Sequence, residues 1–368
     1  MGVRSIRFYD LLAVRRVEAS RAGRLLWPAP LDAMPSAASL ALASAWQDVN
    51  QTVFTFVQRE RGAITGLAQM TARPTRDAWD LVRLAIPSSG PHDHALLPDD
   101  QERERIADDL LDAVVQATGS RGGLRTFARA PADREGLDLL TRRGFRRYAD
   151  EYTLSADYLD LTPAPLPARL SLSARRPADA WGIFQLYCSL APAEARHAEG
   201  LSSKRWSRGS LAAATVDRLR RPREIVLHDE GTIVGWVRLT KTARQQPQRL
   251  EVMLHPGVGD VLPALLTHAA VALDIRRDRR TVCHVRAYED TVLRGLRRVG
   301  FEEAAAHALL VKHAVARVTE RQLLLAALRA QSLGLDVSHY QQPNAPRSLV
   351  PRQVGRVGMT TLEHTQHD

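Results

Sequence analysis

The chain has 368 residues, a length that suggests two domains at about 100–200 residues each. Its hydrophobic fraction of 45% is ordinary for a protein with a buried core. No apolar run approaches the ~18–20 residues that a membrane-spanning helix needs, and the first residues lack the apolar stretch of a secretory signal. The two cysteines, Cys188 and Cys283, form neither a disulfide framework nor a zinc site. We therefore expect a cytoplasmic protein without a membrane partner.

The net charge is +10 and the isoelectric point is about 10.2. A basic surface attracts polyanions, so nucleic acid is one candidate partner. Only three of the 51 basic side chains are lysines, Lys204, Lys241 and Lys312. A generic arginine-rich surface, set by composition rather than by function, is therefore the alternative interpretation.

The first half of the chain begins with a predicted hairpin. Its first strand is predicted at Val53–Val57 and its second, of alternating polarity, at Leu67–Met70. A polar turn and the residues Gly62–Gly66 connect them. The elements predicted next are a strand at Trp79–Ile86, a helix at Gln101–Thr118, a strand at Leu124–Ala128, a helix that ends before Gly144-Phe145, and a strand at Tyr152–Leu154.

The second half repeats this order. The phrase Gly231–Gly235 follows Ile225–Leu227 and opens the strand Trp236–Leu239. Further predicted elements are a strand at Leu250–Leu254, a helix at Val261–Leu273, a strand at Thr281–Val285, a helix that ends before Gly300-Phe301, and a strand at Ala308–Val311. We interpret the paired phrases as a duplication and predict the same strand order in both halves.

The segment Thr162–Pro167 contains three prolines, which favour an extended linker. It separates predicted domains at 1–162 and 168–316. A C-terminal helix is expected within 317–337, and the Pro-, Gln- and Arg-rich stretch 338–368 is expected to be disordered. Residues His92, Asp93 and His94 share one loop, but a single short loop is a poor metal site, so no metal is expected.

This element order resembles the GNAT N-acetyltransferase superfamily in both halves. The resemblance implies an α/β fold with a mixed sheet in each of two tandem GNAT-like domains. In that family the fourth strand ends in a phrase like Val-x-Pro, and a glycine-rich loop then begins a helix. The loop amides and the helix N-terminus hold the pyrophosphate of acetyl-CoA.

The second half keeps part of this motif. Leu254-His255-Pro256 resembles Val-x-Pro, and Gly257-Val258-Gly259-Asp260 leads to Val261 at the helix start. The resemblance implies that Leu254, Gly257, Val258, Gly259, Asp260 and Val261 bind the cofactor. The alternative is a tight turn with Asp260 as helix N-cap. In the first half Asp99, Asp100, Glu102 and Glu104 begin the helix, where they would repel pyrophosphate.

Many family members reprotonate the thiolate with a tyrosine four residues before the Gly of Gly-Phe. Those positions are Leu140 and Leu296 here. Tyr288 is the candidate substitute, and Glu251 on the fourth strand is the candidate base, with His255 as a second one. For Glu251 the alternative is a solvent-facing residue of an alternating strand.

These observations favour an acetyl-CoA-dependent N-acyltransferase acting on an amine acceptor, either a small molecule or a protein. The alternative is a catalytically degenerate GNAT fold that serves as a binding module for RNA, a ribosome or a protein partner. The departures from the tyrosine and loop motifs favour the alternative, so whether the chain is an enzyme is left open here.

Overall fold

The computed structural model describes residues 2–19, 23–28, 30–32, 34–46, 52–60, 63–73, 77–86, 100–132, 135–159, 161, 164–207, 223–240, 246–276 and 279–313. The predicted C-terminal helix, the predicted tail, the phrase start at Gly62 and the loop with His92 and His94 lie outside these residues.

The first half contains β1 (Arg4–Ser5), η1 (Phe8–Asp10), α1 (Leu11–Ala19), β2 (Arg24–Leu26), η2 (Pro30–Asp32), α2 (Ala37–Ala45), β3 (Val53–Glu60), β4 (Ala63–Ala72), β5 (Ala78–Ala85), α3 (Asp100–Ser120), β6 (Arg125–Pro131), α4 (Glu135–Arg142) and β7 (Arg146–Ala156). The second half contains β8 (Leu170–Ala174), η3 (Pro177–Asp179), α5 (Ala180–Leu190), α6 (Ala193–Glu199), α7 (Lys204–Ser207), β9 (Arg223–Asp229), β10 (Thr232–Thr240), β11 (Gln248–Leu254), η6 (Pro256–Val261), α8 (Leu262–Leu273), β12 (Thr281–Arg286), α9 (Asp290–Arg298) and β13 (Glu302–His313).

One mixed 13-stranded sheet runs through both halves, in the order β1-β3-β4-β5-β6-β13-β7-β12-β11-β10-β9-β8, with β2 paired to β5 off this path. From one edge inward the strands are β1-β3-β4-β5-β6, and from the other edge inward they are β8-β9-β10-β11-β12. These two series follow the same order along the chain. The duplication predicts the same strand order in both halves, and the topology confirms it.

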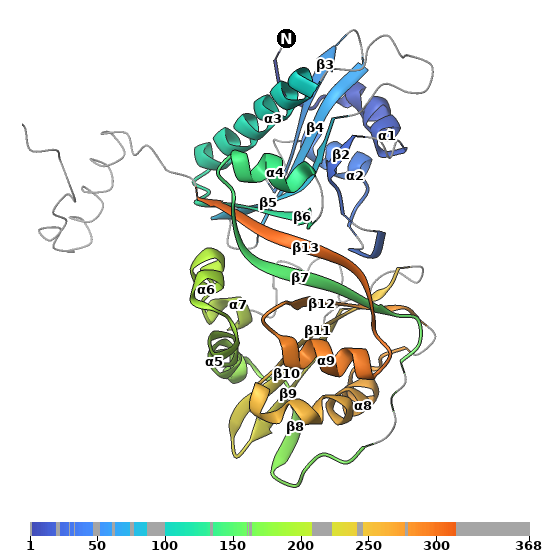
Figure 1. Ribbon diagram of the computed structural model, residues 1–368, viewed down its shortest axis with the longest axis vertical. Coiled ribbons are helices and arrows are strands. Elements are labelled where there is room, and N and C mark those ends of the chain that lie inside the picture. The colour runs from blue at the N-terminus through green and yellow to red at the C-terminus, as the bar shows by residue number, and fades with distance from the viewer. Residues whose placement is uncertain are drawn as a thin grey trace, which may run out of the picture. The chain divides into compact units, whose positions relative to one another are not determined.

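The last strand of each half is exchanged. β13 of the second half pairs antiparallel with β6 of the first, and β7 of the first half pairs antiparallel with β12 of the second. The two exchanged strands also pair with each other, so the green β7 and the orange β13 lie side by side in Figure 1. Repeated phrases give no sign of this exchange, because each strand keeps its own sequence position.

The repeated glycines occupy the turns that the sequence predicts. Gly144 and Gly300 follow α4 and α9 with φ of +80° and +91°, a left-handed conformation that glycine adopts without a Cβ penalty. Gly231 has φ of +87° in the β9–β10 hairpin. Gly66 has a different role, because a Cβ there would lie 2.7 Å from Ile106 Cγ2, on the helix that covers β4.

Two large apolar clusters support the sheet. One joins α8 and α9 to β9–β12, and the other joins α3 and α4 to β3–β6. Contrary to the expectation from the sequence, Pro256–Leu273 is long and apolar enough to span a membrane by length and composition. Leu262, Leu265 and Leu266 of α8 are buried in the first cluster, as in the core helix of a folded domain. The domain bounds at 162 and 168 stay a prediction, since the sheet crosses them.

Candidate functional site

The parallel strands β11 and β12 separate partway along their length. They pair only from Gln248↔Thr281 to Leu250↔Cys283, although β11 continues to Leu254 and β12 to Arg286. Within the described residues, no strand pairs with Glu251–Leu254 on the β12 side. The sheet therefore opens at the end where the predicted glycine loop begins.

His255 fixes the start of that loop. Its Nδ1 accepts a hydrogen bond from the Gly257 amide at 3.2 Å, and its carbonyl accepts one from the Val258 amide at 3.0 Å. The N-cap of α8 is Val261, which makes no side-chain capping hydrogen bond. The alternative interpretation, in which Asp260 is the N-cap, is therefore wrong. His255 thus has a structural role in shaping η6.

The two loop glycines differ in what surrounds them. A Cβ on Gly259 would lie 2.3 Å from Thr291 Cγ2 on α9, whereas a Cβ on Gly257 would meet only the His255 ring, at 3.2 Å. Gly295 of α9 also faces α8, with Leu262 Cδ2 2.3 Å from its built Cβ. Gly259 and Gly295 therefore allow α9 to pack closely against the loop and α8.

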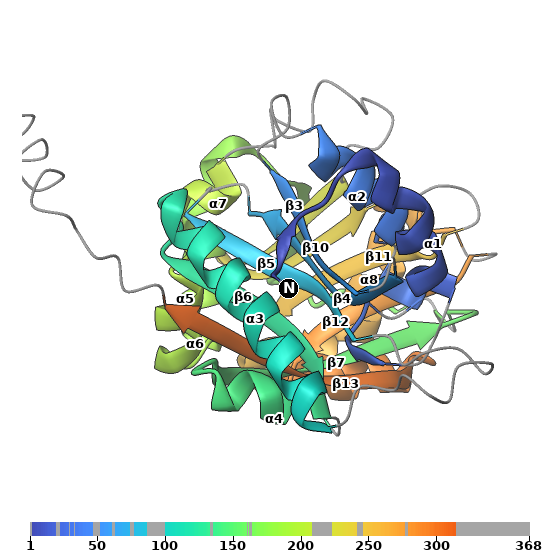
Figure 2. The same ribbon diagram turned by 90° about the horizontal axis from the view of Figure 1, so that it is seen from above.

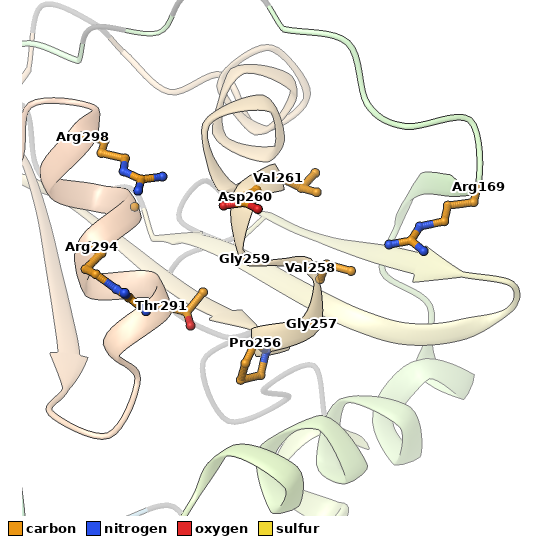
Figure 3. Close-up of a pocket in the computed structure, with 11 residues that line it drawn as sticks. Arg169, Pro256, Gly257, Val258, Gly259, Asp260, Val261, Thr291, Arg294 and Arg298 are labelled. Atoms are coloured by element: carbon orange, nitrogen blue, oxygen red, sulfur yellow. The ribbon is translucent and has the colours of Figure 1, made fainter.

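A hollow of about 270 Å³ lies over this loop and is lined by Pro256–Val261, Thr291 and Gly295. Three arginines also line it: Arg294 and Arg298 from α9, and Arg169 from the segment just before β8. Figure 3 places Arg294 and Arg298 on one side of the loop and Arg169 on the other. Among the described residues of this lining, Asp260 is the one carboxylate, so the hollow favours an anionic ligand.

Of the predicted cofactor residues, the structure brings Gly257, Val258, Gly259, Asp260 and Val261 into the lining of the hollow. Leu254 is 1% exposed and belongs to the core cluster under α8 and α9. None of the three arginines is among the residues predicted from the sequence. The four-residue spacing of Arg294 and Arg298 on a helix is a signal for two of them, because such residues share a face.

Glu251 projects from the opposite face of the sheet. Met253, two residues later on β11, packs against α5, and alternation puts Glu251 on the same side. The Glu251 side chain is 29% exposed, and its Oε1 lies 3.9 Å from Arg238 Nε and 4.0 Å from Arg249 Nε. Glu251 is therefore a half-buried carboxylate flanked by guanidinium groups.

Tyr288 lies in the turn between β12 and α9 and packs against the same cluster as Met253. Burial, with the nearby Glu199 and Glu289 carboxylates, raises the pKa of the Tyr288 hydroxyl above its usual value. The structure therefore brings Tyr288 and Glu251 to one face. His255 lies four residues beyond Glu251, at the start of η6, where its ring is engaged with the Gly257 amide.

A buried network of charged and phenolic groups surrounds Tyr288. Arg286 is ion-paired with Glu151 of β7, and its Nη2 lies 3.2 Å from Glu199 Oε1 of α6. The Tyr187 hydroxyl donates to Glu199 Oε2 at 2.8 Å. Burial raises the pKa of Glu289 to about 7. Because β7 belongs to the first half, the strand exchange makes this network a joint product of both halves.

The matching opening in the first half is filled. β5 and β6 pair only from Ala78 to Leu81 of β5, but β2 then pairs with the remainder, with Arg24 opposite Ala85 and Leu26 opposite Leu84. Helix α4 lies directly on β2, since a Cβ on Gly136 would come 2.2 Å from the Leu25 carbonyl oxygen. The chain's own strand therefore occupies the gap that stays unpaired in the second half.

Arg83 stands in the first half where Glu251 stands in the second. Gln69 follows Gly66 by three residues and lies opposite Arg83 in the antiparallel pair β4–β5. Arg238 follows Gly235 by three residues and lies opposite Glu251 in the pair β10–β11. Arg83 is 3% exposed and donates to Gln69 Oε1 at 3.1 Å and to the Pro35 carbonyl at 2.6 Å. Its burial lowers the guanidinium pKa to about 10, so the group stays cationic at neutral pH and is no base.

Within the described residues, no group of three or more His, Cys, Asp or Glu side chains is arranged to hold a metal ion. The Leu140 and Leu296 side chains, at the positions of the family tyrosine, are 0% exposed and lie in the two core clusters. Their role is therefore to pack α4 and α9 onto the sheet.

No protein-family model matches the sequence, and no curated protein matches it. Solved structures do match. A GCN5-related N-acetyltransferase from Sphaerobacter thermophilus aligns over 85% of this chain and 95% of its own, with a TM-score of 0.50 and 17% identity. A tandem GNAT protein from the clavulanic acid biosynthesis pathway aligns over 85% and 98%, with a TM-score of 0.50 and 14% identity.

A third similar structure is a GCN5-related glucosamine N-acetyltransferase region of a fungal multi-domain β-N-acetylglucosaminidase. It aligns over 84% of this chain and 38% of that one, with a TM-score of 0.51 and 13% identity. The class that the fold defines is thus the GNAT-like one, as the order of strands and helices predicts. More particularly, the chain has the architecture of a tandem GNAT protein.

Proposed function

We propose that this chain is an acetyl-CoA-dependent N-acyltransferase whose second half binds the acyl donor and transfers the acyl group to an amine. The observation that carries the proposal is the arginine-lined hollow over Gly257–Gly259, at the end of an unpaired opening between β11 and β12. An opening in the sheet next to an anion-binding loop suits an extended ligand with phosphates at one end.

The residues present fit the phosphates of CoA. Arg169, Arg294 and Arg298 outnumber Asp260, and guanidinium groups bind phosphate oxygens through paired, charge-assisted hydrogen bonds. At Gly257 a built Cβ would meet only the His255 ring, at 3.2 Å, so a side chain there would crowd the ring that shapes the loop. Asp290 lies outside the lining of the hollow, although one of its carboxylate oxygens is 3.0 Å from Arg294 Nη2.

The donor would supply the activated thioester, and the chain's own groups would manage the protons. Glu251, half-buried on the face opposite α8, is the proposed acceptor of the amine proton. Tyr288, kept protonated by burial, is the proposed donor of a proton to the departing sulfur. Glu289, with a pKa of about 7, is a second candidate base that the sequence analysis missed.

The first half has a supporting role in this proposal. Its opening is filled by β2, and Arg83 occupies the position of the base. It contributes β7 to the sheet of the second half, and with it Glu151, which pairs with Arg286 beside Tyr288. We therefore propose that one half binds the donor while both halves shape the acceptor face.

A binding module without catalysis is the second candidate function. The buried Leu296 favours it, because no hydroxyl stands at the usual position of the acid. The two functions differ in one measurable outcome, since only the enzyme releases free CoA thiol when an amine is supplied.

The experiment is an acetyl-transfer assay on the full chain, with acetyl-CoA, a panel of primary amines and peptides, and detection of released thiol. The enzyme proposal predicts turnover that falls at least tenfold in Tyr288→Phe and in Glu251→Gln. The matched controls are Tyr158→Phe, at a 64% exposed tyrosine, and Glu302→Gln, at an exposed glutamate of β13. Binding of acetyl-CoA without transfer to any amine would favour the module.

A further inference from the structure

An exposed apolar surface lies on the first half, away from the donor site. Nine large hydrophobic side chains are exposed among the described residues, and five of them belong to η1, α1 and the α2 region. These five are Phe8 (51% exposed), Tyr9 (60%), Leu12 (73%), Leu42 (45%) and Trp46 (63%). Monomeric proteins expose single apolar residues freely, but a cluster of this kind marks an interaction site.

Phe8 and Trp46 join the exposed sides of these elements, and the surface that carries the five side chains is called here the α1–α2 face. The rings of Phe8 and Trp46 meet edge to face at a centroid distance of 6.3 Å. Leu12 follows Phe8 by four residues, and Leu42 precedes Trp46 by four, which is about one helical turn in each case. Figures 1 and 2 both show α1 and α2 side by side.

The charges of this face are positive. Arg7, Arg15 and Arg16 are exposed, and Arg15 and Arg16 follow Leu12 at helical spacing. The acidic residues of 2–19 and 34–46 are Asp10 and Glu18, and both are already engaged.

Asp10 is 0% exposed and paired with Arg4 and Arg59, while Glu18 accepts hydrogen bonds from the Ala37 and Ala38 amides at the start of α2. Their carboxylates therefore do not offset the exposed arginines.

This combination restricts the occupant. A second copy of the chain would bring arginines against arginines, which costs energy in a symmetric contact. Exposed aromatic rings beside guanidinium groups match the requirements of unpaired bases and phosphates, because bases stack on rings while the backbone pairs with arginine. The Arg4 and Arg59 guanidinium carbons lie 5.4 and 5.8 Å from the Tyr9 ring centroid, within the range of cation–π attraction.

We propose that the α1–α2 face of the first half binds single-stranded nucleic acid, with Phe8 and Trp46 as the stacking rings and Arg7, Arg15 and Arg16 as the phosphate contacts. The proposal does not depend on acyl transfer by the second half. It gives a binding role to a half whose donor opening is filled by β2.

The test is fluorescence anisotropy of a labelled twelve-nucleotide oligouridine with the full chain, at several salt concentrations. Binding is expected, with an affinity that falls steeply as salt rises. The Phe8→Ala/Trp46→Ala variant should weaken it about tenfold or more, as loss of stacking does. Replacing Arg7, Arg15 and Arg16 by glutamine should lower the slope of log K against log salt by about two, because each phosphate contact to a single strand contributes about 0.7.

Trp181→Ala is the matched control, because Trp181 is 57% exposed on α5 of the second half. It should bind as the wild type does. The proposal is overturned if the oligonucleotide does not bind, if the Phe8/Trp46 variant binds unchanged, or if Trp181→Ala weakens binding equally. Capture of anionic vesicles or of an acidic protein, without binding of the oligonucleotide, would assign the face to another partner and also overturn it.

Discussion

Gly259→Ala should destabilise the protein through one identifiable contact. The added Cβ would lie 2.3 Å from Thr291 Cγ2, more than 1 Å inside an ordinary carbon–carbon contact of about 3.5–4.0 Å. Both atoms belong to packed elements, η6 and α9, so neither moves freely. Overpacking of this kind costs about 1–3 kcal/mol.

Thr291→Ser provides the compensating change. It removes Cγ2 and leaves Thr291 Cβ and Oγ1 at 3.7 and 3.8 Å from the new methyl group, which are ordinary contacts. By itself it removes one methyl group, worth about 0.8 kcal/mol when buried. The double variant should therefore recover most of the stability lost by Gly259→Ala, with a coupling energy of about 1–2 kcal/mol.

The assay is urea unfolding of the full chain, followed by circular dichroism and tryptophan fluorescence to check that the transitions coincide. Gly257→Ala is the control, because its Cβ would meet only the His255 ring at 3.2 Å. A Gly259→Ala protein as stable as the wild type, or a double variant no better than Gly259→Ala, would refute the packing of α9 against the loop.

Four further predictions concern the rest of the molecule. Native mass spectrometry should detect one CoA per chain, because β2 fills the first-half opening, and two would contradict this. Glu151→Gln should lower the free energy of unfolding by about 1.5–3 kcal/mol, since Arg129 and Arg286 lose their shared carboxylate but keep Asp32 and Glu199 as partners; a change below 1 kcal/mol would argue against the network. Burial lowers the pKa of His307 from 6.5 to about 4. Between these pH values the imidazole is protonated in the unfolded state and neutral in the folded state, so the free energy of unfolding falls as pH drops from 6.5 to 4. His307→Gln should reduce that fall relative to the wild type in urea titrations at both pH values, and equal falls would exclude the assignment. Removal of 338–368 should leave the melting temperature unchanged, and a large decrease would show that the segment contributes to the core.

Local sequence signals predict most of the secondary structure. Gly231 and the Gly144 and Gly300 turns require a left-handed backbone, which glycine supplies, so the hairpin and the helix ends are readable from single phrases. The apolar repeat of 101–118 likewise predicts α3, which spans Asp100–Ser120. These features depend on neighbours along the chain and not on distant partners.

Features that depend on distant partners were not predictable. β7 pairs with β12 and β13 pairs with β6, although each strand could equally pair within its own half. The residues of either strand alone do not indicate which partner it takes. β2 is only three residues long and has no period to detect. Arg169 reaches the loop at 256–261 from a segment nearly ninety residues earlier, so its place in the site required the tertiary structure.

The central claim is that the second-half hollow binds the acyl donor, and calorimetric titration of the full chain with acetyl-CoA tests it most directly. Binding is predicted, with an affinity that drops at least tenfold in Arg294→Ala/Arg298→Ala, because each charge-assisted hydrogen bond contributes about 1.5–3 kcal/mol. Arg297→Ala is the control, since Arg297 lies on the same helix outside the lining and pairs with Glu303. No heat of binding, or equal affinity in the double variant and the wild type, would contradict the claim.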